Sequence, residues 1–304
     1  MNARSPWHAE VGLLGRVGNT PLVRLTSFDL PPGVELWAKC EWFNPGGSVK
    51  DRAAAAIVLA AERSGTLKPG MRLLDASSGN TGIAYAWIGA NRGYPLTLCL
   101  PKNANAERQR TLRAYGVELV LTSPLEGSDG AIVRARELAD DPRYFYCDQY
   151  SNDANWRAHL DSTGPEIWRD TEGRVTHWVA TLGTTGTFIG TSKFLKPQGV
   201  RCIAVQPDSP FHGLEGLKHL ETAIVPGIWQ PEGLLDETRW APTERCYELV
   251  RHLAAEEGLL CGISGGAAVW AALEVARGLT EGVVVTILPD GGDRYLSEPH
   301  VWGE

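Results

Sequence analysis

The chain has 304 residues, of which 43% are hydrophobic and 21% charged, and its formal net charge is -7. This apolar fraction can build a core and excludes an intrinsically disordered chain, while the length corresponds to one large domain or two domains of roughly 150 residues each. The acidic balance argues against a nucleic-acid-binding protein, which usually carries a basic excess, and it leaves any anionic ligand to be bound by local hydrogen-bond donors.

Short apolar runs alternate with longer helical patterns along the chain. In chain order, we predict strands at 35–40, 72–75, 95–100, 117–121, 177–181, 201–205 and 283–288. We predict helices at 51–63, 82–91, 107–115, 128–139, 186–195, 242–257 and 265–277. Because the strands are continuous apolar runs that alternate with helices, the pattern predicts a doubly wound α/β fold with mostly parallel strands. Ligands of such folds bind at the carboxyl ends of strands, and four glycine-rich loops lie at such positions here.

The first loop, at 44–52, places Lys50 between a predicted strand and an Ala-rich helix. The positive end of a helix dipole disfavours a charged amine, so we expect the pKa of Lys50 to be lowered and its amine to act as a nucleophile. Alternatively, Lys50 is an exposed lysine with an ordinary ion pair to Asp51.

The second loop, at 77–82, lies between a strand that ends near Asp75 and a helix that starts near Gly82. It carries two hydroxyls, an amide and a third hydroxyl in the run Ser77, Ser78, Gly79, Asn80 and Thr81. With the free N–H groups of the helix, these side chains predict a site for an anion such as a substrate carboxylate. Alternatively, the same residue types form an N-capping turn.

The third loop directly follows the strand at 177–181 and consists of Gly183, Thr184, Thr185, Gly186 and Thr187. It contains neither the GK[ST] of a Walker A loop nor GxGxxG, so a phosphomonoester fits it better than a dinucleotide. A tight glycine turn is the alternative. The fourth loop, at 262–268, offers the hydroxyl of Ser264 to a ring nitrogen, or else Ser264 is the N-cap of the following helix.

The six cysteines form no CxxC pair, and the histidines form no HExxH motif. We therefore expect reduced, buried thiols and no metal site. The first residues lack the apolar core of a signal peptide, and no apolar stretch approaches the roughly 20 residues of a transmembrane helix. Together these features predict a soluble, cytoplasmic protein with no membrane or nucleic-acid partner.

In this order, the four loops resemble those of the cysteine synthase group in the pyridoxal-phosphate β-family, fold type II, and the resemblance covers nearly the whole chain. The motifs that carry it are Gly18-Asn19-Thr20-Pro21-Leu22-Val23, Pro45-Gly46-Gly47-Ser48-Val49-Lys50-Asp51-Arg52, Ser78-Gly79-Asn80-Thr81-Gly82, Glu107-Arg108 with Tyr115-Gly116, Gln149-Tyr150-Ser151-Asn152, Thr163-Gly164-Pro165-Glu166-Ile167-Trp168 and Asp293-Arg294-Tyr295-Leu296-Ser297. The form Gly-Thr-Thr-Gly-Thr at 183–187 is similar to the cysteine synthase B branch, since the A branch has a third glycine there.

The resemblance implies a role for each residue of these loops. Lys50 would hold pyridoxal 5'-phosphate as a Schiff base and act as general acid and base, and the loop 183–187 would bind the phosphate. Asn80 would contact the ring hydroxyl, and Ser264 would face the pyridine nitrogen. The substrate carboxylate would be bound by the residues Ser77, Ser78, Gly79, Thr81 and Gln149. Ser77 stands where the family usually has threonine, and the hydroxyl is kept.

For the fold, the resemblance implies two open, twisted, mostly parallel sheets flanked by helices, similar to tryptophan synthase β, with the active site between the domains. The smaller domain, 46–150, would be inserted in a larger domain of residues 1–45 and 151–304 and would close over the substrate. The implied reaction is β-replacement through an aminoacrylate. O-acetylserine or O-phosphoserine would react with sulfide, thiosulfate or a thiocarboxylate to give L-cysteine or S-sulfocysteine. The resemblance also implies a homodimer.

Lys218 matches a position at which B-type and O-phosphoserine-using relatives carry a basic residue, usually arginine, that binds an anionic group near the cofactor. Alternatively, it is a solvated lysine on a helix. A small sulfur-carrier protein remains a candidate partner, although the short tail after Ser297 counts against it.

Three other functions stay open. A short cystathionine β-synthase-like enzyme fits the length, whereas threonine dehydratases usually place Phe where this chain has Val49. A non-catalytic binding module with the same fold would be expected to have lost one of Lys50, Asn80, Ser264 or the phosphate loop. A nucleotide-binding Rossmann protein would be expected to carry GxGxxG.

Overall fold

The computed structural model describes residues 6–7, 10 and 12–303, so the expectation about the first residues lies largely outside the described part. Its strands are β1 (Leu22–Arg24), β2 (Gly33–Cys40), β3 (Arg72–Ala76), β4 (Leu96–Pro101), β5 (Glu118–Thr122), β6 (Tyr144–Tyr146), β7 (His177–Thr181), β8 (Arg201–Pro207), β9 (Glu237–Ala241) and β10 (Glu281–Leu288). Its α-helices are α1 (Lys50–Ser64), α2 (Asn80–Arg92), α3 (Ala106–Ala114), α4 (Gly127–Leu138), α5 (Ala154–Asp161), α6 (Thr163–Asp170), α7 (Gly186–Leu195), α8 (Thr243–Glu256), α9 (Ile263–Arg277) and α10 (Pro299–Trp302).

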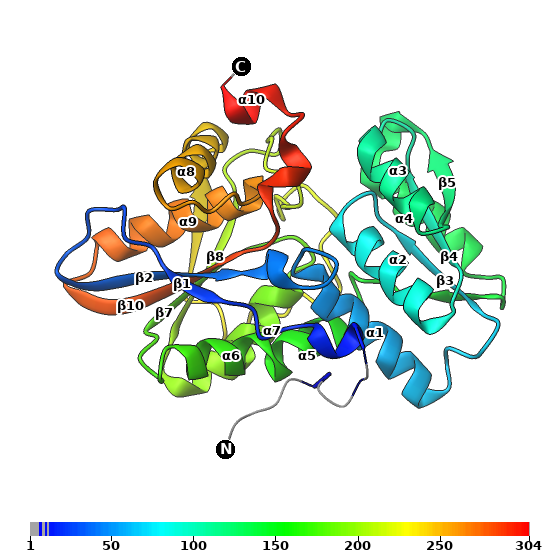
Figure 1. The fold of residues 1–304 in the computed structure, drawn as a ribbon, viewed down its shortest axis with the longest axis horizontal. Helices are drawn as coiled ribbons and strands as arrows, with labels where there is room; N and C mark the ends of the chain where they lie inside the picture. The colour runs from blue at the N-terminus through cyan, green and yellow to red at the C-terminus, as the bar shows by residue number, and fades with distance from the viewer. Residues whose placement is uncertain (1–5, 8–9, 11, 304) are drawn as a thin grey trace.

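The strands form two separate sheets (Figure 1). One has six strands in the order β1-β2-β10-β7-β8-β9, and only the β1–β2 pair is antiparallel. The other has four parallel strands in the order β5-β4-β3-β6. The predicted fold class, two mostly parallel sheets flanked by helices, is therefore confirmed.

The six-stranded sheet is apolar on both faces because helices cover both. On β10, Val284 and Leu288 pack with α8 and α9, whereas the alternate residues Val283, Val285 and Ile287 pack with α6 and α7. This two-sided burial explains why its strands are continuous apolar runs in the sequence. α9 lies close to α8, since a Cβ on Gly266 would overlap the backbone oxygen of Cys246.

The four-stranded sheet is built in the same way. α4 covers one face through Ala131, Ile132 and Ala135, and α1, α2 and α3 pack on the other. Figure 1 shows this sheet and its helices to the right of the six-stranded sheet, with α1 running between the two. No helix of the described residues has both the length and the apolarity needed to cross a membrane.

The sequence did not predict six of these elements. β1 and β6 have only three residues each, which is too short for a periodic signal, and β9 is a polar edge strand. α5 and α6 are eight-residue helices separated at Ser162, where the backbone leaves the helical region. α10 has four residues near the end of the chain.

Candidate active site

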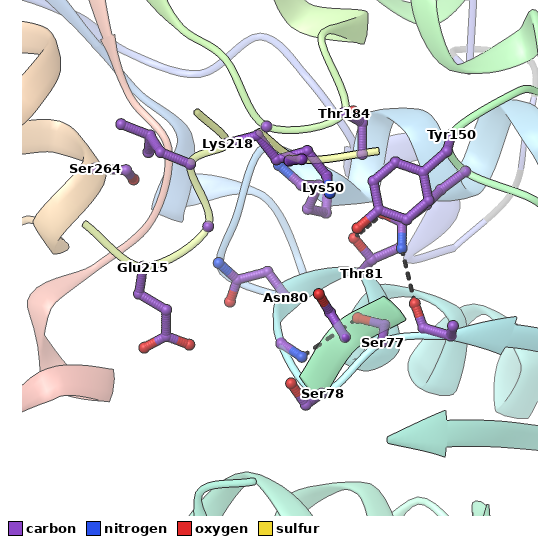
Figure 2. Close-up of a pocket in the computed structure, with 18 of the residues that line it drawn as sticks. Lys50, Ser77, Ser78, Asn80, Thr81, Tyr150, Thr184, Glu215, Lys218 and Ser264 are labelled. Carbon is purple, nitrogen blue, oxygen red and sulfur yellow. Dashed lines mark hydrogen bonds between the residues drawn. The ribbon is translucent and has the colours of Figure 1, made fainter. Parts of the chain in front are cut away.

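The predicted functional residues meet in one cavity of about 570 Å³ whose walls come from both sheets. It is lined by thirteen of them, namely Lys50, Ser77, Ser78, Gly79, Asn80, Thr81, Gln149, Gly183, Thr184, Thr185, Thr187, Lys218 and Ser264. Gly186, the remaining one, is buried at the first position of α7. Figure 2 shows Lys50 with Thr184 on one side and Ser77, Asn80 and Thr81 on the other. The segments that follow β2, β3, β7 and β8 thus converge on one cavity, at the carboxyl ends of strands from both sheets.

Lys50 is the first residue of α1, and the helix start is fixed by a hydrogen bond of 2.8 Å from the backbone N–H of Val49 to the oxygen of Pro289. Burial lowers the pKa of Lys50, and the carboxylates of Asp290 and Glu41 act in the opposite direction. The direction agrees with the sequence prediction, although burial is its largest cause. The alternative of an ion pair with Asp51 is wrong, because the Asp51 carboxylate accepts hydrogen bonds from Trp87 Nε1 and from the backbone of Gly46.

A buried ionic cluster anchors the helix that carries Lys50. Arg52 is fully buried, and its guanidinium donates to both oxygens of Glu41 and both oxygens of Glu166 at 2.7–2.8 Å. Lys39 Nζ lies 2.9 Å from Glu166. These contacts join α1 to β2 and α6, so they hold the backbone of Lys50 in place.

The hydroxyl-rich loop between β3 and α2 is held open toward the cavity. Ser77 Oγ accepts hydrogen bonds from the backbone N–H groups of Gly79 at 3.3 Å and Gly82 at 3.1 Å, which leaves its own proton free to donate. The N-cap of α2 is Gly79, which has no side-chain cap, so of the alternative capping turn only the contact of Ser77 with the N–H of Gly82 in the first turn is found. The Thr81 hydroxyl donates to Gln149 Oε1 at 2.7 Å, so the structure brings together two residues that are 68 positions apart.

Asp75 joins the same loop to Gln149, a contact that the sequence did not suggest. Its carboxylate accepts hydrogen bonds from the backbone N–H groups of Ala76 at 2.7 Å and Gln149 at 3.3 Å. Burial raises the pKa of Asp75 to about 7. The end of β3 and the segment that follows β6 are therefore tied together next to the loop.

The loop 183–187 has the geometry of a phosphate cradle. Thr185 has a left-handed backbone with φ of 73°, and its buried hydroxyl has no hydrogen-bond partner among the described residues. A Cβ on Gly186 would overlap Oδ1 of Asn155, and Asn155 Nδ2 donates to Thr184 Oγ1 at 3.1 Å. The strain of the left-handed residue, the unpartnered hydroxyl and the N-terminus of α7 together fit an anion such as a phosphate.

Ser264 is the second residue of α9, whose N-cap is Gly262, so the alternative role of Ser264 as N-cap is wrong. Ser264 lines the cavity, and no hydrogen bond of its hydroxyl is found within the described part of the chain. The hydroxyl is therefore available to a ligand.

Residues after β10 hold Asn80, and sequence reasoning gave them no role. Asn80 Nδ2 donates to Asp290 Oδ2 at 2.7 Å, and the Tyr295 hydroxyl donates to the same oxygen at 2.7 Å. Arg294 donates to Asn80 Oδ1. Burial raises the pKa of Asp290, while Asn80, Tyr295, Arg294 and Lys50 lower it. The sequence signals were the position of Asp290 just after a strand and the place of Arg294 and Tyr295 in one of the motifs that carry the resemblance.

Lys218 lies in an irregular segment rather than on a helix, so the alternative of a solvated helical lysine is wrong. The side chain is half-buried, and Nζ lies 5.1 Å from the centroid of the Tyr150 ring. Burial lowers the pKa of Lys218, and Asp129 raises it. Its backbone N–H donates to the oxygen of Leu182 at 2.8 Å, next to the phosphate loop.

Comparison with known proteins agrees with this geometry. Residues 13–290 match the family described as pyridoxal-phosphate dependent enzyme. The cysteine synthase of Aquifex aeolicus is 50% identical over 94% of this chain and 90% of its own length, and cysteine synthase B of Escherichia coli is 44% identical over 95% of both. The crystal structure of a cysteine synthase from Entamoeba histolytica superposes with a TM-score of 0.90 at 35% identity, covering 95% of this chain and 90% of that one.

Proposed function

The chain belongs to the family of pyridoxal-phosphate dependent enzymes, and from this premise we propose that it makes L-cysteine by β-replacement on an O-activated serine. The observation that carries the proposal is the single cavity. It joins a lysine of lowered pKa, a phosphate cradle and a hydroxyl-rich loop that can bind a carboxylate. A related solved structure is named O-acetyl serine sulfhydrylase, and we therefore propose O-acetylserine and sulfide as the substrates.

The cavity fits the cofactor of the family. Lys50 would hold it covalently, the loop 183–187 would bind its phosphate, and Asn80 and Ser264 would contact its ring. Pyridoxal phosphate, when bound, supplies the sink for negative charge at the substrate Cα. Lys50 Nζ would remove the Cα proton and return it, and its lowered pKa keeps part of the amine neutral for this task.

The substrate carboxylate would be bound by the loop after β3 and by Gln149. Ser77 keeps a free proton to donate, and the N-terminus of α2 adds backbone N–H groups and a favourable dipole. Ser78, Gly79 and Thr81 complete this proposed subsite. Carboxylate binding would replace the hydrogen bond between Thr81 and Gln149, and so would change the contacts of the segment that follows β6.

The direct test is the visible spectrum and the product of the purified protein. We expect absorbance from lysine-bound cofactor, a change of that absorbance on adding O-acetylserine, and L-cysteine when sulfide follows. Homocysteine in place of sulfide tests the cystathionine β-synthase-like activity. A colourless protein that binds no pyridoxal phosphate would overturn the proposal.

Replacing Thr185 with glycine should separate fold stability from cofactor binding. The left-handed backbone costs a β-branched residue about 1–3 kcal/mol, part of which the flexibility of glycine offsets, so we expect the cofactor-free variant to be more stable by about 1 kcal/mol. The lost hydroxyl should reduce the rise in melting temperature that the cofactor causes. Thr185→Ser is the control, and an equal rise in both variants would contradict a phosphate contact.

Lys218 is proposed to bind an anionic leaving group, which would make O-phosphoserine a substrate. We expect Lys218→Ala to lower kcat/KM with O-phosphoserine by roughly 10- to 100-fold, the value of one charge-assisted hydrogen bond, and to change it far less with O-acetylserine. Lys193→Ala is a matched control, because Lys193 also packs on an aromatic ring, that of Trp156, but does not line the cavity. Equal losses with both substrates would remove the proposed phosphate contact.

We also propose that residues 46–150 form a smaller domain that closes on the substrate, inserted in a larger one of residues 1–45 and 151–304. Sheet composition supports this division, since β3, β4, β5 and β6 all lie between residues 72 and 146 and every other strand lies outside. Amide hydrogen exchange with and without a substrate carboxylate would test the closure.

Three further proposals concern the surroundings of the enzyme. A homodimer follows from the resemblance and is tested by sedimentation. A cytoplasmic location is supported by the six cysteines, all free and buried, as reduced thiols are in that compartment. A small sulfur-carrier protein with a C-terminal thiocarboxylate is an alternative sulfur source, and its competition with sulfide in the cysteine assay would test it.

A further inference from the structure

An ion pair crosses the cavity from one sheet layer to the other. Arg108 lies on α3, which packs against the four-stranded sheet, and Glu215 lies in the segment that follows β8 of the six-stranded sheet (Figure 1). The guanidinium of Arg108 donates to both carboxylate oxygens of Glu215, with 3.1 Å between Nη2 and Oε2. Both residues line the cavity.

Arg108 is a buried arginine, 8% exposed, and burial disfavours its charge, while Glu215 raises its pKa. The guanidinium also lies 5.3 Å from the centroid of the Tyr295 ring, whose hydroxyl binds Asp290. A paired arginine in this setting resists displacement, because separating the pair would leave a buried charge without its partner. We therefore expect this ion pair to be harder to break than one between two exposed side chains.

The segment 213–219, which contains Glu215, forms the wall of the cavity next to the phosphate cradle. Gly216 has a left-handed backbone with φ of 85°. Its backbone oxygen lies so close to Gly183 that a Cβ on Gly183 would be only 2.5 Å from that oxygen. Two residues later, the backbone of Lys218 is bonded to Leu182. Figure 2 shows Glu215 and Lys218 among the side chains that surround the cavity.

We propose that Arg108 and Glu215 are a positioning pair that ties α3 to the segment 213–219 and so keeps the cavity closed over the bound substrate. The inference rests on the proposed function. Arg108 acts through Glu215 and the Tyr295 ring, and Glu215 acts through the backbone of Gly216 and Lys218.

Closure matters because water competes with sulfide for the substrate. In the abortive reaction, O-acetylserine and one water give pyruvate, ammonia and acetate. The Cβ–O bond to acetate breaks, the water oxygen becomes the keto oxygen of pyruvate, and the amino nitrogen leaves as ammonia. When the ion pair holds the segment 213–219 in place, water is excluded from the cavity and a smaller share of the substrate follows this reaction.

The test is a charge exchange in the cofactor-loaded protein. We expect Arg108→Glu and Glu215→Arg each to raise the ratio of pyruvate to L-cysteine by roughly 5- to 20-fold, in the range of coupling between contacting charges. The double variant, with the charges exchanged, should return the ratio to within about threefold of the native value. Glu215→Gln, at a half-exposed loop position, keeps the shape and removes the charge, so it covers the case in which Arg108→Glu does not fold.

A second measurement does not depend on turnover. Amide hydrogen exchange of 213–219 should rise in each single variant and fall again in the double variant, while Glu62→Gln, which breaks the exposed pair with Arg92, should leave it unchanged. If the native protein makes no cysteine, the proposed function fails and the exchange data still decide the role of the pair. Native exchange in the single variants, or no recovery in the double variant, would overturn the positioning role.

Discussion

Replacing Lys50 with alanine is expected to abolish turnover, with kcat lowered by at least about 10³-fold, while the fold is kept. The variant loses the amine that holds the cofactor and the group that moves the Cα proton, and proton transfer by a positioned side chain alone is worth roughly 10²- to 10⁴-fold. Lys50 lines the cavity and has no hydrogen bond or ion pair through Nζ among the described residues, so its loss removes no structural contact.

Visible absorbance and steady-state assays check this expectation. The variant should lack the absorbance of lysine-bound cofactor, but its phosphate cradle should still bind pyridoxal phosphate. Added primary amines such as methylamine should therefore restore part of the activity. Lys193→Ala serves as the control for removing a lysine from the same protein. Full turnover and native absorbance in Lys50→Ala would show that another group carries the reaction.

The loops of the site could be predicted because their functional residue types stand close together in short runs of the sequence. The runs 77–81 and 183–187 each come at the end of a strand, and Lys50 begins the helix after β2, so each lies near the carboxyl end of a parallel strand, where ligands of such folds bind. Gln149 came from the resemblance alone, since only the structure brings it to Thr81.

The residues that support the site could not be predicted in this way. Asp290 reaches Asn80 across 210 positions, and Arg108 reaches Glu215 across 107. Such pairs depend on how the two sheets are set against each other, which no local periodicity encodes. Single polar residues are common on helices and in loops, so nothing in the sequence marked Asp290 as the partner of Asn80 or Glu215 as the partner of Arg108.

The fold follows a similar division. Strands buried on both faces give long apolar runs, and the prediction found every one of them in the sheet centres, such as β7, β8 and β10. The edge strands β1, β6 and β9 were missed because they are short or polar. Edge strands need only one partner, so their residues carry a weaker signal.

Replacing Arg52 with methionine is expected to lower the free energy of unfolding by about 3–5 kcal/mol at neutral pH. The substitution leaves the carboxylates of Glu41 and Glu166 buried without the guanidinium that pairs with them, and removing one partner of a buried pair costs about this much. Urea unfolding followed by tryptophan fluorescence measures the loss. Arg92→Met is the control, since Arg92 pairs with Glu62 at a more exposed position and its loss should cost about 0–1 kcal/mol.

The pH dependence of unfolding tests whether Arg52 stabilises the protein through its charge. In the native protein burial raises the pKa of Glu41 and Glu166, but Arg52 outweighs it, so both pKa values lie below the usual range. Their contribution to stability is present above the unfolded pKa of about 4.3 and is lost as the pH falls below it. Without Arg52, burial should raise the pKa of Glu41 above the unfolded value, so protonation at acid pH stabilises the variant.

The native protein should therefore lose stability between about pH 5 and pH 3, while the difference between native and Arg52→Met proteins narrows. Adding Glu41→Gln to the variant should recover part of the lost stability at neutral pH, because it removes one uncompensated buried charge. A difference that stays constant with pH, or a double variant weaker than Arg52→Met, would mean that Arg52 stabilises α1 by packing rather than by charge. The start of α1, and with it Lys50, would then owe its position to the apolar contacts of the helix.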